Sequence, residues 1–110
     1  MHLARASLAV IAVATMAAVT TGVSAQQLSD WQRGRNLARQ VCAECHWVER
    51  RAAPSPNPRS PTFVDIASTA GMTGIALNVI LHSSHRYMPN IILSDEQARA
   101  VITYILSLKR

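Results

Sequence analysis

Apolar residues recur at three- and four-residue spacing in separate stretches of the chain, a pattern that predicts short amphipathic helices. The clearest stretch is the last one, where Ser94 stands at the N-cap position and Gln97 completes a capping box. A regular helical period then continues through Ala98, Val101, Ile102, Ile105 and Leu108. We therefore predict a C-terminal helix that begins after Ser94.

A second amphipathic stretch begins at Ser29, a residue suited to cap a helix whose first turn contains Asp30. One face of this helix is formed by Trp31, Gly34, Leu37, Ala38 and Val41. The predicted helix ends at about Val41 or Cys42. A glycine inside such a stripe costs roughly 1 kcal/mol relative to alanine. Gly34 therefore indicates a place where another helix passes very close.

Two loops and two short helices are predicted between these ends. Residues 47–61 hold four of the five prolines and have no helical period, so they are predicted to form a loop. Thr62 and Asp65 have capping-box-like spacing at the start of a short helix that ends at Gly71.

The next short helix is predicted from Thr73 to about His82, and residues 83–90 are predicted to form the second loop. No stretch shows the alternation of a strand. The pattern therefore predicts an all-α fold.

The N-terminal residues have the pattern of a secretory signal peptide. A short basic start ends at Arg5, residues 6–19 are apolar or small, and Val23 and Ala25 precede a predicted cleavage site after Ala25. The apolar run of about 14 residues is too short for a membrane anchor, which needs roughly 20. We expect residues 1–25 to be removed on export to the periplasm, which leaves one domain, residues 26–110, without a membrane span.

The segment Cys42-Ala43-Glu44-Cys45-His46 has the C-x-x-C-H spacing of covalent haem attachment. On a helical turn, residues three apart point the same way, so both thiols can bond one edge of a haem, and His46 can then reach the iron. A thioredoxin-like redox pair, a local disulfide and half a zinc site are the alternatives. None of them requires a histidine directly after the second cysteine.

The chain as a whole resembles the class I cytochromes c over residues 29 to 108. Gly34 lies eight positions before Cys42, as in that family, in which the first and last helices cross at this residue. Tyr104 stands where the family has an aromatic residue packed against the crossing. The resemblance implies three to four short helices packed round one covalently bound haem c.

Further site residues follow from the same resemblance. Ser60-Pro61-Thr62-Phe63 is similar to the family's Gly-Pro-x-Leu segment, so the Pro61 carbonyl is expected to accept a hydrogen bond from His46. Ser60 departs from the family's glycine. Met88, followed by Pro89, looks like the axial methionine of the family.

Other side chains compete for the sixth position on the iron. Met72 is the remaining methionine of the domain, and His82 or His85 would give a bis-histidine haem of low potential. Arg35 and Arg59 are candidate partners of a haem propionate, because the planar guanidinium suits a carboxylate.

Iron with two protein ligands has no position for a substrate, so the sequence favours an electron carrier without enzymatic activity. Residues 26–110 contain ten basic and six acidic residues, a net charge of +4, which suits redox partners with acidic surfaces. The alternatives are a gas-binding or peroxidatic haem protein with a labile Met88, and a fixed subunit of a periplasmic oxidoreductase. Export and the lack of a basic run argue against nucleic acid as a partner.

Overall fold

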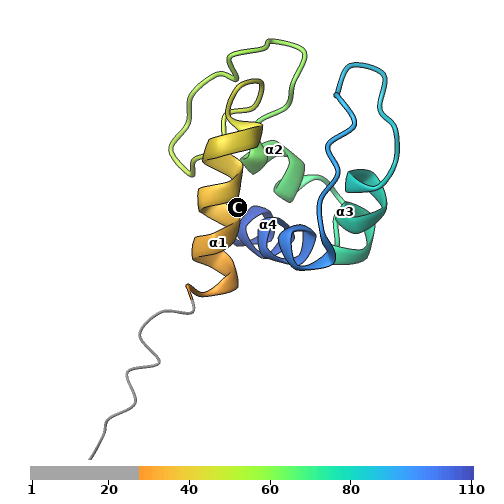
Figure 1. The fold of residues 1–110 in the computed structure, drawn as a ribbon. Helices are drawn as coiled ribbons and strands as arrows, with labels where there is room; N and C mark the ends of the chain where they lie inside the picture. Colours follow the sequence, from red (N-terminus) through yellow and green to blue (C-terminus); the bar gives the residue numbers. More distant parts are fainter. Residues whose placement is uncertain (1–27) are drawn as a thin grey trace, which may run out of the picture.

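The computed structural model describes residues 28–110, so the signal peptide and its cleavage site lie outside the described residues. Residues 28–110 form four α-helices and one π-helical turn (Figure 1). In chain order, the elements are α1 (Asp30–Leu37), η1 (Ala38–Cys42), α2 (Phe63–Ser68), α3 (Gly74–Leu81) and α4 (Asp95–Ser107). This part of the chain contains no strand, which confirms the predicted all-α fold. None of its helices is long and apolar enough to cross a membrane.

Each α-helix begins directly after a side chain that accepts a backbone hydrogen bond. The N-caps are Ser29, Thr62, Thr73 and Ser94; three of them are predicted caps, whereas Thr73 was predicted as the first residue of its helix. Such a cap satisfies one of the amide groups that the first turn leaves without a partner. The end of α2 differs from the prediction, because the helix stops at Ser68. Gly71 follows with a φ of +74°, in the left-handed region that glycine adopts without strain.

The first helix changes type before it reaches the cysteines. The α-helical pattern ends at Leu37, and the chain continues as the π-helix η1 to Cys42. The amide of Ala43 donates to the carbonyl of Ala38 over 2.9 Å, one residue further than in an α-helix. The expected helix to Val41 or Cys42 is thus present, but its last turn is wider than predicted.

Helices α1 and α4 cross in close contact at Gly34 (Figure 1). A Cβ atom placed on Gly34 would lie 2.0 Å from the Ala100 carbonyl oxygen and 2.9 Å from the Tyr104 Cβ atom. No real side chain fits in that space. The predicted crossing of the N- and C-terminal helices is therefore confirmed, and the absence of a side chain at Gly34 permits it.

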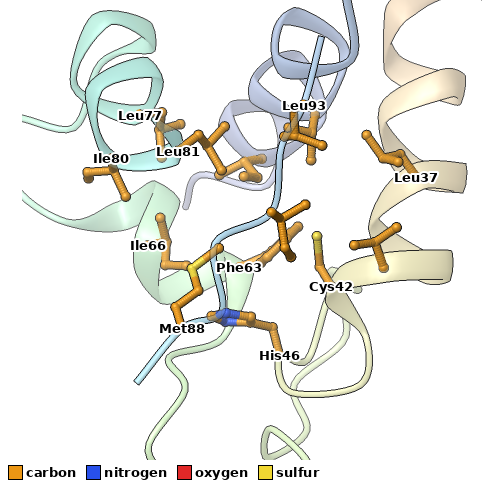
Figure 2. Close-up of a pocket in the computed structure, with 14 residues that line it drawn as sticks. Leu37, Cys42, His46, Phe63, Ile66, Leu77, Ile80, Leu81, Met88 and Leu93 are labelled. Carbon is orange, nitrogen blue, oxygen red and sulfur yellow. The ribbon is translucent and has the colours of Figure 1, made fainter. Parts of the chain in front are cut away.

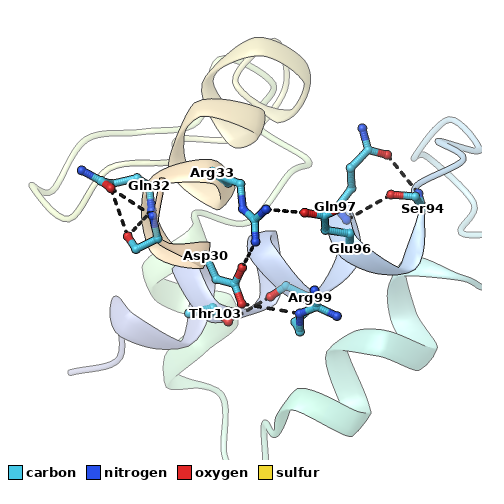
Figure 3. A network of polar contacts seen from close by, with 9 residues as sticks. Asp30, Gln32, Arg33, Ser94, Glu96, Gln97, Arg99 and Thr103 are labelled. Atoms are coloured by element: carbon cyan, nitrogen blue, oxygen red, sulfur yellow. Dashed lines mark hydrogen bonds and ion pairs between the residues drawn. The ribbon is translucent and has the colours of Figure 1, made fainter. Parts of the chain in front are cut away.

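Charged side chains connect the same two helices at the surface (Figure 3). Arg33 pairs with Asp30 on α1 and with Glu96 on α4, and Arg99 lies 3.5 Å from Asp30. Partly exposed pairs of this kind contribute at most about 1 kcal/mol each. Close packing, more than charge, therefore holds the crossing.

The hydrophobic core lies where α2 and α3 pack on α4. Tyr104 of α4 is 1 % exposed, and its ring meets the Trp31 ring edge-on at 5.5 Å. Its hydroxyl donates to the Val48 carbonyl over 2.7 Å. Tyr104 thus fastens the chain that follows the cysteines to the helical core.

Candidate haem site

The attachment segment forms a tight turn directly after η1. The amides of Cys45 and His46 both donate to the Cys42 carbonyl, over 3.2 and 2.9 Å. Both thiols are free and partly buried. Burial raises the pKa of the Cys42 thiol to about 11. The sulfur is therefore protonated near neutral pH and lies among apolar side chains.

The His46 ring is held in one orientation by the loop that follows it. Its Nδ1 lies 2.7 Å from the Pro61 carbonyl oxygen, which can only accept. The ring therefore donates from Nδ1, and the lone pair of Nε2 remains available to a metal. The Phe63 ring packs beside the imidazole at a centroid distance of 5.6 Å.

An apolar cavity opens between the helices beside His46 (Figure 2). The cavity is partly open to solvent. Residues from all five helical elements, from the turn after η1 and from the segment before α4 line it: Leu37, Val41, Cys42, His46, Phe63, Ile66, Leu77, Ile80, Leu81, Met88, Ile91, Leu93, Val101 and Ile105. Figure 2 shows Met88 and the His46 ring at the same end of the cavity.

Two further hollows share His46 and Met88 with this cavity. One is lined by both cysteines as well, so that Cys42, Cys45, His46 and Met88 surround a single space. The other, which we call the outer hollow, lies toward the surface and is also lined by Pro61. The sequence-predicted site residues, which span 47 positions of the chain, are therefore brought together in one place.

Of the three rival ligands, Met72 and His85 lie near the site and His82 does not. Met72 and His85 both line the outer hollow. His82 ends α3, and its Nδ1 lies 2.8 Å from the Asn78 carbonyl, away from the three hollows. His85 is thus the histidine that the fold leaves near Met88.

The two candidate propionate partners have different surroundings. Arg35 lies 3.1 Å from Glu49, and this ion pair raises the pKa of the guanidinium. Arg35 therefore has a structural partner in Glu49, and its contact with a propionate stays a prediction. Arg59, in contrast, lines the outer hollow.

Sequence reasoning missed one residue that holds the loop after the cysteines and one that lines the site. Glu49 binds Arg35 and also Arg39, at 2.6 Å, and so ties the start of the proline-rich loop to the first helix. Tyr87 lines two of the three hollows that contain Met88. The adjacency of Tyr87 to Met88 was the one available signal, whereas nothing in the pattern marks Glu49.

The residues present fit a covalently bound haem. The main cavity is lined by carbon-rich side chains that suit a porphyrin face; the free thiol of Cys42 lies at its edge, and that of Cys45 lines the adjoining hollow. An imidazole with a free Nε2 and a thioether sulfur supply two ligands that haem iron accepts. Residues 28–110 contain no group of three or more His, Cys, Asp and Glu side chains that would hold a metal ion directly.

Comparisons with known proteins agree with this fit. The cytochrome c family model matches residues 31–109. The chain is 30% identical to cytochrome c-552 of Bradyrhizobium diazoefficiens over 92 residues, which cover 84% of this chain and 88% of the relative. No solved structure gives a significant match. With Cys42 and Cys45 at the thiol positions of haem c, the chain belongs to the cytochrome c family, as a class I c-type cytochrome.

Proposed function

We propose that this haem electron-transfer protein is a periplasmic carrier of single electrons whose iron is held by His46 and Met88. One observation supports the ligand pair above all others: His46 and Met88 line the same hollow as Cys42 and Cys45. When bound, the haem supplies a one-electron iron couple, and a methionine ligand raises its reduction potential relative to a second histidine.

The protein residues have separate tasks in this proposal. Cys42 and Cys45 hold the cofactor at one edge, and the Pro61 carbonyl fixes the imidazole so that its Nε2 points to the metal. Apolar residues such as Phe63 and Leu77 exclude water from the cavity. With both axial positions filled by protein, no position remains for a substrate. Electrons are therefore exchanged with redox partners without catalysis at the metal.

The distribution of charge favours partners with acidic docking surfaces. Asp30, Glu49 and Glu96 are each bound by arginines of α1, η1 or α4. Arg59 and Arg86, at the outer hollow, take part in no ion pair within residues 28–110. Asp65 is the one acidic residue that lines this hollow, so its rim has an excess of basic residues that would attract an acidic partner.

Periplasmic location is proposed from the N-terminal pattern. Residues 1–25 have the basic start, apolar run and small residues of a cleaved signal. An intact mass that begins at Gln26 would support it, and one that retains Met1 would contradict it.

Visible spectra of the matured holoprotein test the ligand assignment. The parent should show the sulfur-to-iron charge-transfer band of the ferric protein, and Met88→Ala should lose it. Met72→Ala removes the other methionine that lines the outer hollow, and the band should remain. A parent without the band contradicts Met88 and favours His85. Ready uptake of carbon monoxide by the ferrous parent would instead support a gas-binding protein.

The docking surface is tested by electron-transfer rates with an acidic redox protein at increasing salt. Rates should fall steeply, because screening removes the attraction between exposed charges. Rates that stay flat from low to physiological ionic strength contradict steering by Arg59 and Arg86. The ligand assignment would be unaffected.

A further inference from the structure

Met88 lies in a segment that has few polar connections to the rest of the domain. Within residues 28–110, the only hydrogen bond of residues 84–93 joins the Met88 amide to the His85 carbonyl at 3.3 Å, inside the segment itself. Arg86 forms no ion pair in this part of the chain. The side chains of residues 84–93 are exposed apart from those of Met88, Ile91 and Leu93, which are half-buried. Something else must therefore limit how far Met88 moves from the metal.

One contact does connect this segment to the opposite side of the site. The guanidinium carbon of Arg59 lies 5.2 Å from the centre of the Tyr87 ring. A cation within about 6 Å of an aromatic face is attracted by it. Tyr87 directly precedes Met88, and Arg59 stands two residues before Pro61, whose carbonyl holds His46. The contact thus joins the loop behind one proposed ligand to the loop that carries the other.

Neither partner is engaged elsewhere. Tyr87 is 67% exposed, and Arg59 makes no ion pair within residues 28–110. Both residues line the outer hollow together with His46 and Met88. The pair therefore lies across the solvent side of the site, where the Met88 segment would have to move for an external ligand to reach the metal.

We propose that Arg59 and Tyr87 form a clasp that positions Met88 and limits its displacement by external ligands. This inference rests on the proposed His46 and Met88 ligation and adds two positioning residues to it. An external ligand binds only when the Met88 segment is open, so its apparent affinity is proportional to the open fraction. A cation–π contact at an exposed site should reduce that fraction about two- to fivefold.

Imidazole titration of the ferric holoprotein tests the clasp, with loss of the sulfur-to-iron charge-transfer band as the readout. Arg59→Met removes the charge, and Tyr87→Leu removes the ring. Each should raise the apparent affinity for imidazole about two- to fivefold. Tyr87→Phe and Arg59→Lys keep the interacting groups and should bind imidazole nearly as the parent does. The double variant Arg59→Met/Tyr87→Leu should exceed neither single variant.

Arg51→Met is the matched control. Arg51 makes a comparable contact, 6.0 Å from the centre of the Trp47 ring, but within one loop and away from Met88. Its removal should leave the imidazole affinity unchanged. Equal affinities of Arg59→Met and Arg51→Met, or an undiminished effect of Arg59→Met in the Tyr87→Leu background, would overturn the clasp while leaving Met88 as a ligand. A parent without the charge-transfer band would overturn both.

Discussion

The two sides of the haem site are attached to the helical core very differently. On the His46 side, the backbone from Cys45 to Phe63 is fixed by hydrogen bonds to its own turn, to the Tyr104 hydroxyl and, through Glu49, to Arg35 and Arg39. On the Met88 side, residues 84–93 form one internal hydrogen bond and the contact between Arg59 and Tyr87.

This difference means that the two proposed ligands are held with different rigidity. The position of His46 follows from its contact with the Pro61 carbonyl and from the packing of α1 on α4. The position of Met88 depends on half-buried apolar residues and on one cation–π contact. In a carrier built in this way, the His46 side of the site is fixed, and substitutions near Met88 are the ones that would change how firmly a ligand is held.

The largest effect should come from breaking the crossing that supports the His46 side. Gly34→Ala places a methyl group 2.0 Å from the Ala100 carbonyl oxygen, and backbone cannot move away cheaply. We expect the free energy of unfolding to fall by about 3 kcal/mol or more in urea titrations. Gly74→Ala adds the same methyl group 3.6 Å from Ile102 and should be neutral or slightly stabilising. Equal losses in the two variants would contradict the crossing argument.

A smaller effect should follow from releasing the proline-rich loop from α4. Tyr104→Phe removes the hydroxyl that binds the Val48 carbonyl and leaves that oxygen without its partner. We expect a loss of about 1–2 kcal/mol in the free energy of unfolding, measured in urea. Tyr87→Phe is the control, because its exposed hydroxyl makes no hydrogen bond within residues 28–110. A Tyr104→Phe variant as stable as this control would show that the loop is held by other contacts.

The smallest effect concerns the ion pairs of Glu49. Burial raises the pKa of Glu49, but the hydrogen bonds from Arg39 and Arg35 outweigh burial and hold it below its usual value of 4.5. A lowered carboxyl pKa gives stability that is present above the unfolded-state value and is lost as the pH falls through the folded-state value. The parent should therefore lose more stability than Glu49→Gln in urea titrations between about pH 5 and pH 3, by up to about 1 kcal/mol.

Glu44→Gln is the control for that measurement. Glu44 is exposed and belongs to none of the ion pairs of residues 28–110. Its variant should keep the pH dependence of the parent. If Glu49→Gln kept it too, the ion pairs with Arg35 and Arg39 would contribute nothing to stability.

Features governed by local chemistry were predicted well from the sequence. Ser29 and Ser94 could be placed at helix starts because capping depends on residues only three positions apart. Gly34 was identified because a glycine costs stability within an apolar stripe unless a neighbour needs the space. The attachment segment could also be recognised from the sequence, since its spacing is set by the covalent chemistry.

Features governed by long-range side-chain contacts were not predicted. The ion pairs of Glu49 join residues 10 and 14 positions apart, and the clasp joins residues 28 positions apart. Neither distance corresponds to a helical period, so the apolar pattern contains no signal for them. The apolar pattern predicts an end of α2 at Gly71, whereas the helix ends before Thr69.

The π-helix η1, which follows α1 and ends at Cys42, allows the number of residues to change without a change in the direction of later side chains. In an ordinary α-helix, the gain or loss of one residue rotates every later side chain by about 100°. A π-turn contains one residue more than the α-turn it replaces and so absorbs that rotation locally. Ala38–Cys42 is therefore the stretch in which the spacing between the glycine crossing and the thiols is adjusted without turning the thiols away from the cavity.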